Sequence, residues 1–175
     1  MELVYITNPE RSSGQYLSFA HESNEGFTID LNHARLYTPE EARVIYNATK
    51  GASVPVYKSF AERMFRMVVP ASAVSEEESL NSKGELYCIQ VLDDKESEYL
   101  CFEGAQGKTI EYDDVMLILK GMVGSYRMLS DRPFKIWPSS YIGSKVISIL
   151  RKDLLHDGNS IAIPDFAQSP HAAYA

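Results

Sequence analysis

The chain has 175 residues, of which 45% are hydrophobic and 23% charged, and its formal net charge is −7. This length suits one domain or two small ones, no run of about 18 apolar residues is present to span a membrane, and the acidic balance argues against a main role in binding nucleic acid. Two cysteines do not make a disulfide framework, and the N-terminus lacks the basic start of a signal peptide, so we expect a cytoplasmic protein.

Two strand signals around a polar turn open the chain. Period-two alternation predicts a hairpin whose buried face carries Val4, Ile6, Leu17 and Phe19. The tyrosines at positions 5, 16 and 99 fall outside this face. They would form an exposed strip suited to binding another protein, or they would be covered by the helices.

The clearest helix start in the chain is at Thr38. It is an N-cap residue, Pro39 takes the first helical position, and Glu41 completes a capping box. Lys50-Gly51 is expected to end this helix, and a strand is expected at 65–69.

The second half shows the same order of signals after a polar linker at 76–84. It predicts strands at 86–92 and 99–103, a helix at about 113–127 and a strand at 134–137. Beyond them, an apolar stripe that follows Ser144 predicts a C-terminal helix within 144–158, and residues 159–175 are expected to form a loose tail.

The two halves also match in sequence. With an offset of 83 positions, ELVYI at 2–6 falls on ELYCI at 85–89, and YLSF at 16–19 falls on YLCF at 99–102. With two residues deleted, GFTID at 26–30 falls on GKTIE at 107–111, and we further align 65–72 with 134–140. Internal similarity of this kind indicates a repeated structural unit.

We therefore predict an α+β fold made of two tandem β-hairpin–helix–strand repeats, at 1–75 and 85–143. Such units are too small to bury both faces alone, so we expect a pseudo-twofold arrangement with a shared core, sealed by the C-terminal helix.

No pattern in the chain indicates a catalytic or metal site. The four histidines and two cysteines lack metal-ligand spacing, and no phosphate-binding loop or nucleophile motif occurs. We expect no cofactor and no metal.

A binding surface is instead expected where the two halves differ. The second half has gained an aromatic cluster at its last strand and an acidic hairpin tip, and aromatic residues anchor interfaces while rim acids steer association. The predicted partner-binding residues are Trp137, Tyr141, Asp93, Asp94, Glu96 and Glu98. For Trp137 a second interpretation stays open, in which it fills the core position of Val68.

The stretch GFTIDLNHARLYTPEEA at 26–42 resembles a pattern found in small, mostly uncharacterised bacteriophage proteins. The pattern runs from Gly-aromatic-Thr, through an acidic-Leu turn and an Ala, to an aromatic-Thr pair and Glu-Glu-Ala. The second half keeps only Gly107 and Thr109 of it. The resemblance implies a phage-encoded protein that binds a host protein, and it implies no catalytic residue.

The sequence thus favours a non-catalytic protein that binds and inhibits or redirects a host protein, such as a defence factor. One alternative is a small-molecule or nucleotide binder that uses the cleft between the repeats. A second alternative is an enzyme with an unrecognised site, which two perturbed titratable groups in one cleft would indicate. Neither a membrane nor nucleic acid is expected as the main partner.

Overall fold

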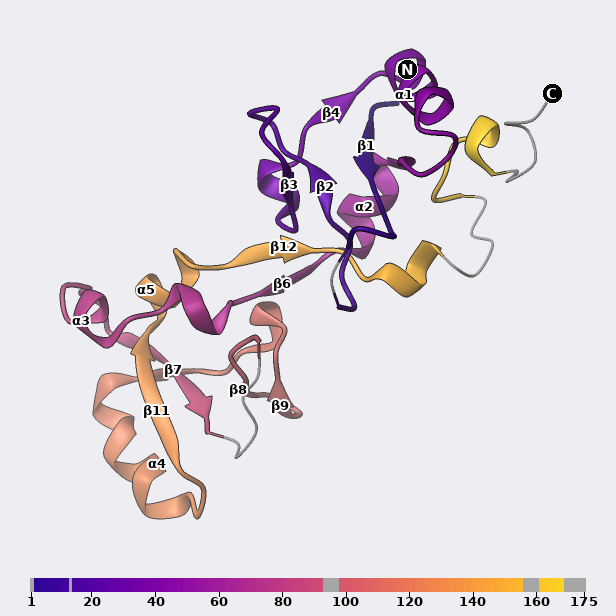
Figure 1. The fold of residues 1–175 in the computed structure, drawn as a ribbon. Coiled ribbons are helices and arrows are strands. Elements are labelled where there is room, and N and C mark those ends of the chain that lie inside the picture. Colours follow the sequence, from indigo (N-terminus) through magenta and orange to yellow (C-terminus); the bar gives the residue numbers. More distant parts are fainter. Residues whose placement is uncertain (1, 13, 93–97, 156–160, 169–175) are drawn as a thin grey trace. The chain divides into compact units, whose positions relative to one another are not determined.

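The structure is a computed structural model that describes residues 2–12, 14–92, 98–155 and 161–168 (Figure 1). Over these residues the fold is α+β, with three antiparallel sheets and five α-helices. The α+β class predicted from the sequence is therefore confirmed.

The chain divides into two compact units. Unit 1 contains residues 1–66 together with 148–175, and unit 2 contains the intervening residues 67–147. The expected linker at 76–84 begins with the short helix α3 (Glu76–Ser79) and lies within unit 2. Each unit is described by itself below.

Unit 1 is built on a five-stranded antiparallel sheet around β1 (Val4–Thr7). β5 (Val54–Tyr57) pairs along the whole of β1. Two shorter strands share the other edge of β1: β2 (Phe19–Ala20) pairs with Thr7, and β4 (Leu36–Tyr37) pairs with Val4 and Tyr5. β3 (Phe27–Thr28) extends the sheet beyond β2.

Both faces of β1 are buried. On one face, Val4 and Ile6 pack with Ala42 of α1 (Pro39–Ala48). On the other face a larger cluster forms, to which the helix α2 (Lys58–Met64) contributes. Its buried members are Tyr5, Leu17, Phe19, Leu31, Val56, Phe60, Ala61, Leu150 and Ala162. The four residues predicted to be buried are buried, but they divide between these two clusters.

The capping box of α1 is present as predicted. The backbone N–H of Glu41 donates to Thr38 Oγ1 at 3.3 Å, and the backbone N–H of Thr38 donates to Glu41 Oε2 at 2.8 Å. The helix is followed by Lys50 and Gly51, which both have positive φ, as a helix C-terminus requires.

Unit 2 has the same strand arrangement around β7 (Leu86–Val91). β11 (Phe134–Pro138) pairs along one edge of β7, and the two lie side by side in Figure 1. β10 (Leu117–Leu119) and β8 (Phe102–Gly104) share the other edge, and β9 (Gly107–Thr109) extends the sheet beyond β8.

The remaining elements of unit 2 are short. Besides α3, they are the helices α4 (Val123–Leu129) and α5 (Ser139–Gly143) and the 3-10 turns Ala71–Ala73, Tyr112–Asp114 and Lys120–Met122. The helix predicted at about 113–127 is wrong. Leu117–Leu119 form the strand β10, which pairs with β7, so the helix α4 begins only at Val123.

The registers of the two units coincide residue by residue. Adding 83 to residues up to His21 and 81 to residues from Gly26 onward converts the pairs of unit 1 into those of unit 2. The matched pairs include Thr7–Phe19 with Gln90–Phe102, Val4–Tyr37 with Tyr87–Ile118, Val4–Tyr57 with Tyr87–Pro138, and Phe19–Thr28 with Phe102–Thr109. Under this match β5 corresponds to β11, so the alignment of 65–72 with 134–140 is wrong.

The C-terminal helix predicted within 144–158 is also wrong. Residues Ile147–Ile149 form the strand β12, and a 3-10 helix follows at Lys152–Leu155. In this segment the consecutive residues Ser148, Ile149 and Leu150 are all buried, whereas an amphipathic helix would bury only the residues along one side. Residues 156–158 of the expected helix lie outside the described residues.

Each unit is completed by a segment that follows the other half in sequence. In unit 1 the N–H of Leu17 donates to the carbonyl oxygen of Leu150 at 2.9 Å, and in unit 2 the N–H of Leu100 donates to that of Val69 at 2.8 Å. Leu150 follows β12, and Val69 follows β6 (Arg66–Val68).

Candidate binding surface

The two aromatic residues predicted to bind a partner are buried in the core of unit 2. Trp137 and Tyr141 stack with ring centroids 6.0 Å apart and pack with Cys88 and Phe102. The indole Nε1–H of Trp137 donates to Gln90 Oε1 at 2.7 Å. Of the two interpretations of Trp137, core packing is therefore confirmed, although its matched position is Val56 and not Val68.

The hydroxyl of Tyr141 is fixed inside the unit. It accepts a 2.6 Å hydrogen bond from the backbone N–H of Ser75 and donates one of 3.2 Å to Glu78 Oε2. Lys145 Nζ, which also lies 2.8 Å from that carboxylate oxygen, is 5.3 Å from the centre of the tyrosine ring. The expectation that Tyr141 is exposed is wrong, since α5 turns its ring inward.

The acidic hairpin tip is largely outside the described residues. Asp93, Asp94 and Glu96 fall there, and Glu98 alone is described. Glu98 is exposed, and its carbonyl oxygen accepts a 2.9 Å hydrogen bond from the N–H of Ala71.

The expected strip of exposed tyrosines does not form. Tyr5 and Tyr99 are buried and Tyr16 is half-buried. Burial, with the nearby charge of Glu62 as a smaller cause, raises the pKa of Tyr5 above its ordinary value. Of the two possibilities, burial is the one observed, because both faces of β1 are covered.

Unit 2 instead exposes large aliphatic side chains that the sequence analysis did not single out. Met128 and Leu129 of α4 are 88% and 84% exposed, and Leu119 and Met122 are also exposed just before the helix. We call these four residues the 119–129 surface. Isolated exposed aliphatic residues are ordinary, but four of them within eleven residues of chain make this segment a candidate interaction site.

The matched positions of unit 1 are smaller or polar. Under the offset of 81, the four residues of the 119–129 surface stand where unit 1 has Thr38, Glu41, Asn47 and Ala48. The same strand-and-helix framework therefore does not need large aliphatic side chains at these places. The correct offset would have revealed this difference from the sequence.

The charge around α4 also differs from that around α1. The segment 117–138 contains four basic residues and one acid, Asp131, whereas the matched segment 36–57 contains two acids and two bases. The basic residues are Lys120, Arg127, Arg132 and Lys135, all of them exposed. Lys135 forms a 2.6 Å ion pair with Glu76. This region is thus basic in an acidic protein.

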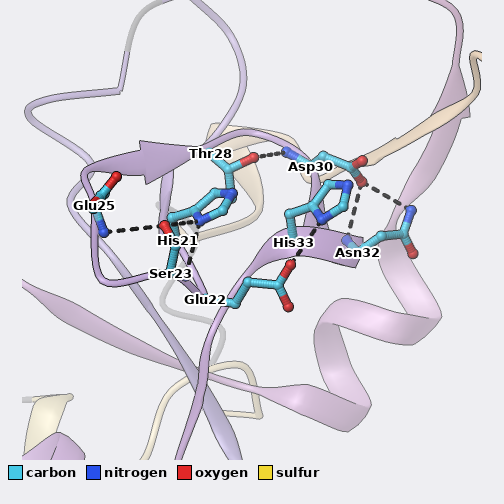
Figure 2. Close-up of polar contacts among 8 residues, drawn as sticks. All are labelled: His21, Glu22, Ser23, Glu25, Thr28, Asp30, Asn32 and His33. Atoms are coloured by element: carbon cyan, nitrogen blue, oxygen red, sulfur yellow. Dashed lines mark hydrogen bonds and ion pairs between the residues drawn. The ribbon is translucent and has the colours of Figure 1, made fainter.

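A second cluster of polar side chains lies at the β2–β3 turn of unit 1 (Figure 2). The rings of His21 and His33 are stacked with centroids 6.0 Å apart. His21 Nδ1 lies 2.7 Å from Ser23 Oγ, and His33 Nδ1 lies 3.0 Å from Glu22 Oε1. The hydrogen bond to Glu22 is the main cause that raises the pKa of His33.

Beside the histidines, Asp30 connects this turn to β12 through hydrogen bonds. Its Oδ1 accepts hydrogen bonds from the backbone N–H and the side-chain amide of Asn32, at 3.1 and 3.0 Å, and from the N–H of Ser148 at 3.0 Å. Asp30 is buried and these bonds satisfy it. The cluster is therefore explained by its role in holding the turn and β12 together.

The matched turn of unit 2 encloses a cavity of about 300 Å³, lined by residues 104–109 and Asp114. Gly104 and Asp114 stand where unit 1 has the two histidines. A Cβ at Gly104 would lie 2.8 Å from the carbonyl oxygen of Asp114, so glycine is needed here. The backbone contact explains the turn without a ligand.

Among the described residues, no group of three His, Cys, Asp or Glu side chains is arranged to hold a metal ion. In the same part of the chain, no helix is long and apolar enough to cross a membrane.

No family model, curated protein or solved structure matches the chain. Function therefore has to be argued from the geometry alone.

Proposed function

We propose that this is a non-catalytic binding protein that binds a host protein and inhibits or redirects it. The observation that carries the proposal is the 119–129 surface. Its large aliphatic side chains are exposed to water, which is unfavourable in free energy, and packing within unit 2 does not require them there.

The match between the two units supports this placement. We propose that the two halves are tandem repeats that arose by duplication of one β-hairpin–helix–strand unit. Positions that keep the framework stayed similar, such as Phe19 and Phe102, which are both fully buried. A surface position that changed from Asn47 to Met128 has no such explanation, and a partner supplies one.

The origin in a bacteriophage is a further proposal, which rests on the resemblance of residues 26–42 to small phage proteins. It would place the protein in the cytoplasm of the host cell, where a defence factor is one candidate target. The acidic net charge fits a protein partner better than nucleic acid as the main partner.

Affinity capture tests the proposal. The protein is immobilised and bacterial lysates are passed over the wild type and over the variant Leu119→Thr/Met122→Glu/Met128→Asn/Leu129→Ala, which carries the residues of unit 1. Val44→Ser is the matched control, because Val44 is a 69% exposed aliphatic residue on α1 and Ser125 takes its place in α4.

We expect a protein that is retained by the wild type and by Val44→Ser and is lost from the fourfold variant. An identical set of captured proteins on all three columns contradicts the proposed function. Native mass spectrometry of the purified protein is run beside it, and a tightly bound metabolite there would favour a small-molecule binder.

A further inference from the structure

The helix α1 of unit 1 is covered by a short segment of the chain. Phe166, in the 3-10 turn Asp165–Ala167, packs edge to face on Tyr46 with ring centroids 6.0 Å apart. The guanidinium of Arg43 lies 5.0 Å from the centre of the Phe166 ring. One aromatic side chain thus packs against α1 at Arg43 and Tyr46.

The matched helix α4 has no such cover among the described residues. Its inward side is already satisfied, because Tyr126 packs edge to face on Phe134 at 4.9 Å and its hydroxyl donates to Glu103 Oε1 at 3.0 Å. Met128 and Leu129 take no part in these contacts and remain exposed. The helix therefore folds onto its sheet and still presents an uncovered apolar side.

The positive charges in and around α4 indicate the chemistry of a partner. Lys120 and Arg127 are exposed within the same short segment, and Arg132 follows it directly. Basic residues beside an apolar surface favour an acidic partner and speed its association. Methionine side chains adapt to differently shaped aromatic or aliphatic anchors.

We propose that α4 is the docking site for a short acidic segment of a partner protein, anchored by one aromatic side chain against Met128 and Leu129. The inference rests on the proposed function and names the chemistry of the partner. In unit 1 the ring of Phe166 packs on α1 at Arg43 and Tyr46, which match Gly124 and Arg127, so the proposed anchor would lie one position further along the helix. A membrane is the poorer fit, because α4 has only seven residues, and interfacial helices are longer and carry a continuous apolar face.

Peptide display tests the proposal on the full-length protein. A library of random dodecapeptides is selected against the immobilised wild type, and the most enriched peptide is then measured by fluorescence anisotropy. We expect enriched peptides to hold one aromatic residue flanked by acids. The affinity of the best peptide should fall at least about tenfold in Met128→Asn/Leu129→Ala and stay unchanged in Val44→Ser.

The charge is tested by a second variant. Arg127→Gln should weaken the salt dependence of peptide binding, because one of the charges that attract the acids is lost. Circular dichroism of each variant shows whether it is folded, and the high exposure of the substituted residues predicts that all of them are.

Several outcomes overturn the proposal. They are the absence of enrichment, enrichment of peptides without acids, and equal binding of the peptide to the wild type and to Met128→Asn/Leu129→Ala. Binding of phosphatidylglycerol vesicles that this variant loses would identify a membrane instead. Concentration-dependent self-association in sedimentation velocity that the variant loses would identify a second copy.

The test separates this inference from the proposed function. If lysate proteins depend on the 119–129 surface and no acidic peptide is selected, the protein is a binder and only the partner chemistry is wrong. If nothing in the lysate depends on that surface, the proposed function itself fails.

Discussion

Leu17 and Leu150 lie near opposite ends of the chain, yet the backbone N–H of one donates to the carbonyl oxygen of the other at 2.9 Å. Both side chains are fully enclosed in the larger core cluster of unit 1. The matched contact of unit 2, between Leu100 and Val69, joins residues that both lie within 67–147. Unit 1 therefore needs residues from both the start and the last part of the chain to complete its core, whereas unit 2 is built from one continuous segment.

This difference predicts how fragments fold. A fragment of residues 67–147 contains every buried member of its own core cluster and should unfold cooperatively on heating. A fragment of residues 1–66 lacks Leu150 and Ala162 and should show no cooperative transition, because its largest core cluster is left open. Thermal melts followed by circular dichroism make the comparison.

Adding a synthetic peptide of residues 148–175 to the fragment 1–66 is the control, and we expect it to restore a cooperative melt. A cooperative transition of 1–66 without the peptide would show that the segment after β12 is dispensable for unit 1.

The capping box of α1 gives a second prediction. Thr38→Ala should lower the free energy of unfolding by about 1 kcal/mol, because the N–H of Glu41 loses its acceptor at the helix start. Val44→Ala on the exposed side of the same helix should change it by less than about 0.5 kcal/mol. Urea unfolding of the three proteins is the measurement, and a Thr38→Ala variant as stable as the wild type would show that the cap contributes nothing.

The features that the sequence predicted correctly are local ones. The capping box at Thr38 depends on residues three positions apart, and the buried residues Val4, Ile6, Leu17 and Phe19 follow from alternation within short strands. The failed helix at 144–158 is a known ambiguity, because a short apolar run fits a buried strand as well as a helix.

The candidate site could not be predicted, because it depends on long-range pairing. Whether Tyr141 points inward is decided by where α5 lies on β7, and β7 lies more than forty residues earlier in the chain. The correspondence of β5 with β11 could not be recognised from the sequence either. Val56 and Trp137 take matched positions in these strands but differ in size and chemistry. The contrast between Asn47 and Met128 follows from the offset of 81 that matches 26–30 with 107–111, but only the structure shows that Met128 is exposed.

The histidine turn predicts a pH dependence. The hydrogen bond to Glu22 raises the pKa of His33, so the folded state binds this proton more tightly than the unfolded state does. The resulting stabilisation is fully present below the ordinary pKa of the unfolded chain, about 6.5, and is lost as pH rises through the raised pKa of the folded state. Because His33 is exposed, the effect on stability should be small.

Proton NMR titration of the four histidines checks this directly. In Glu22→Gln the pKa of His33 should move down, since the charged acceptor is replaced by a neutral one. An unchanged titration curve for His33 in that variant would show that the pair with Glu22 does not persist in solution.

The buried thiol of Cys88 should resist modification. Burial raises its pKa to about 11, so little thiolate is present at pH 8, and the side chain is also closed off from reagent. In Cys101→Ser, where Cys88 is the remaining cysteine, reaction with a disulfide reagent should be slow under native conditions and fast in denaturant. Equally fast reaction in both conditions would place Cys88 at the surface.

The last prediction concerns the hydroxyl of Tyr141, which the structure assigns to stability. In Tyr141→Phe the ring still fills the core of unit 2, but the N–H of Ser75 loses an acceptor at 2.6 Å and Glu78 loses a donor. We expect a loss of about 1 kcal/mol in the free energy of unfolding, because a partly buried N–H is left without its partner. Tyr126→Phe is the matched control: Tyr126 is only half-buried and its hydroxyl bonds to the side chain of Glu103, so its removal should cost less than about 0.5 kcal/mol. Partner capture should be the same for wild type and Tyr141→Phe, since the hydroxyl is not part of the proposed 119–129 surface. A Tyr141→Phe variant of wild-type stability that no longer captures the partner would return this residue to the binding site.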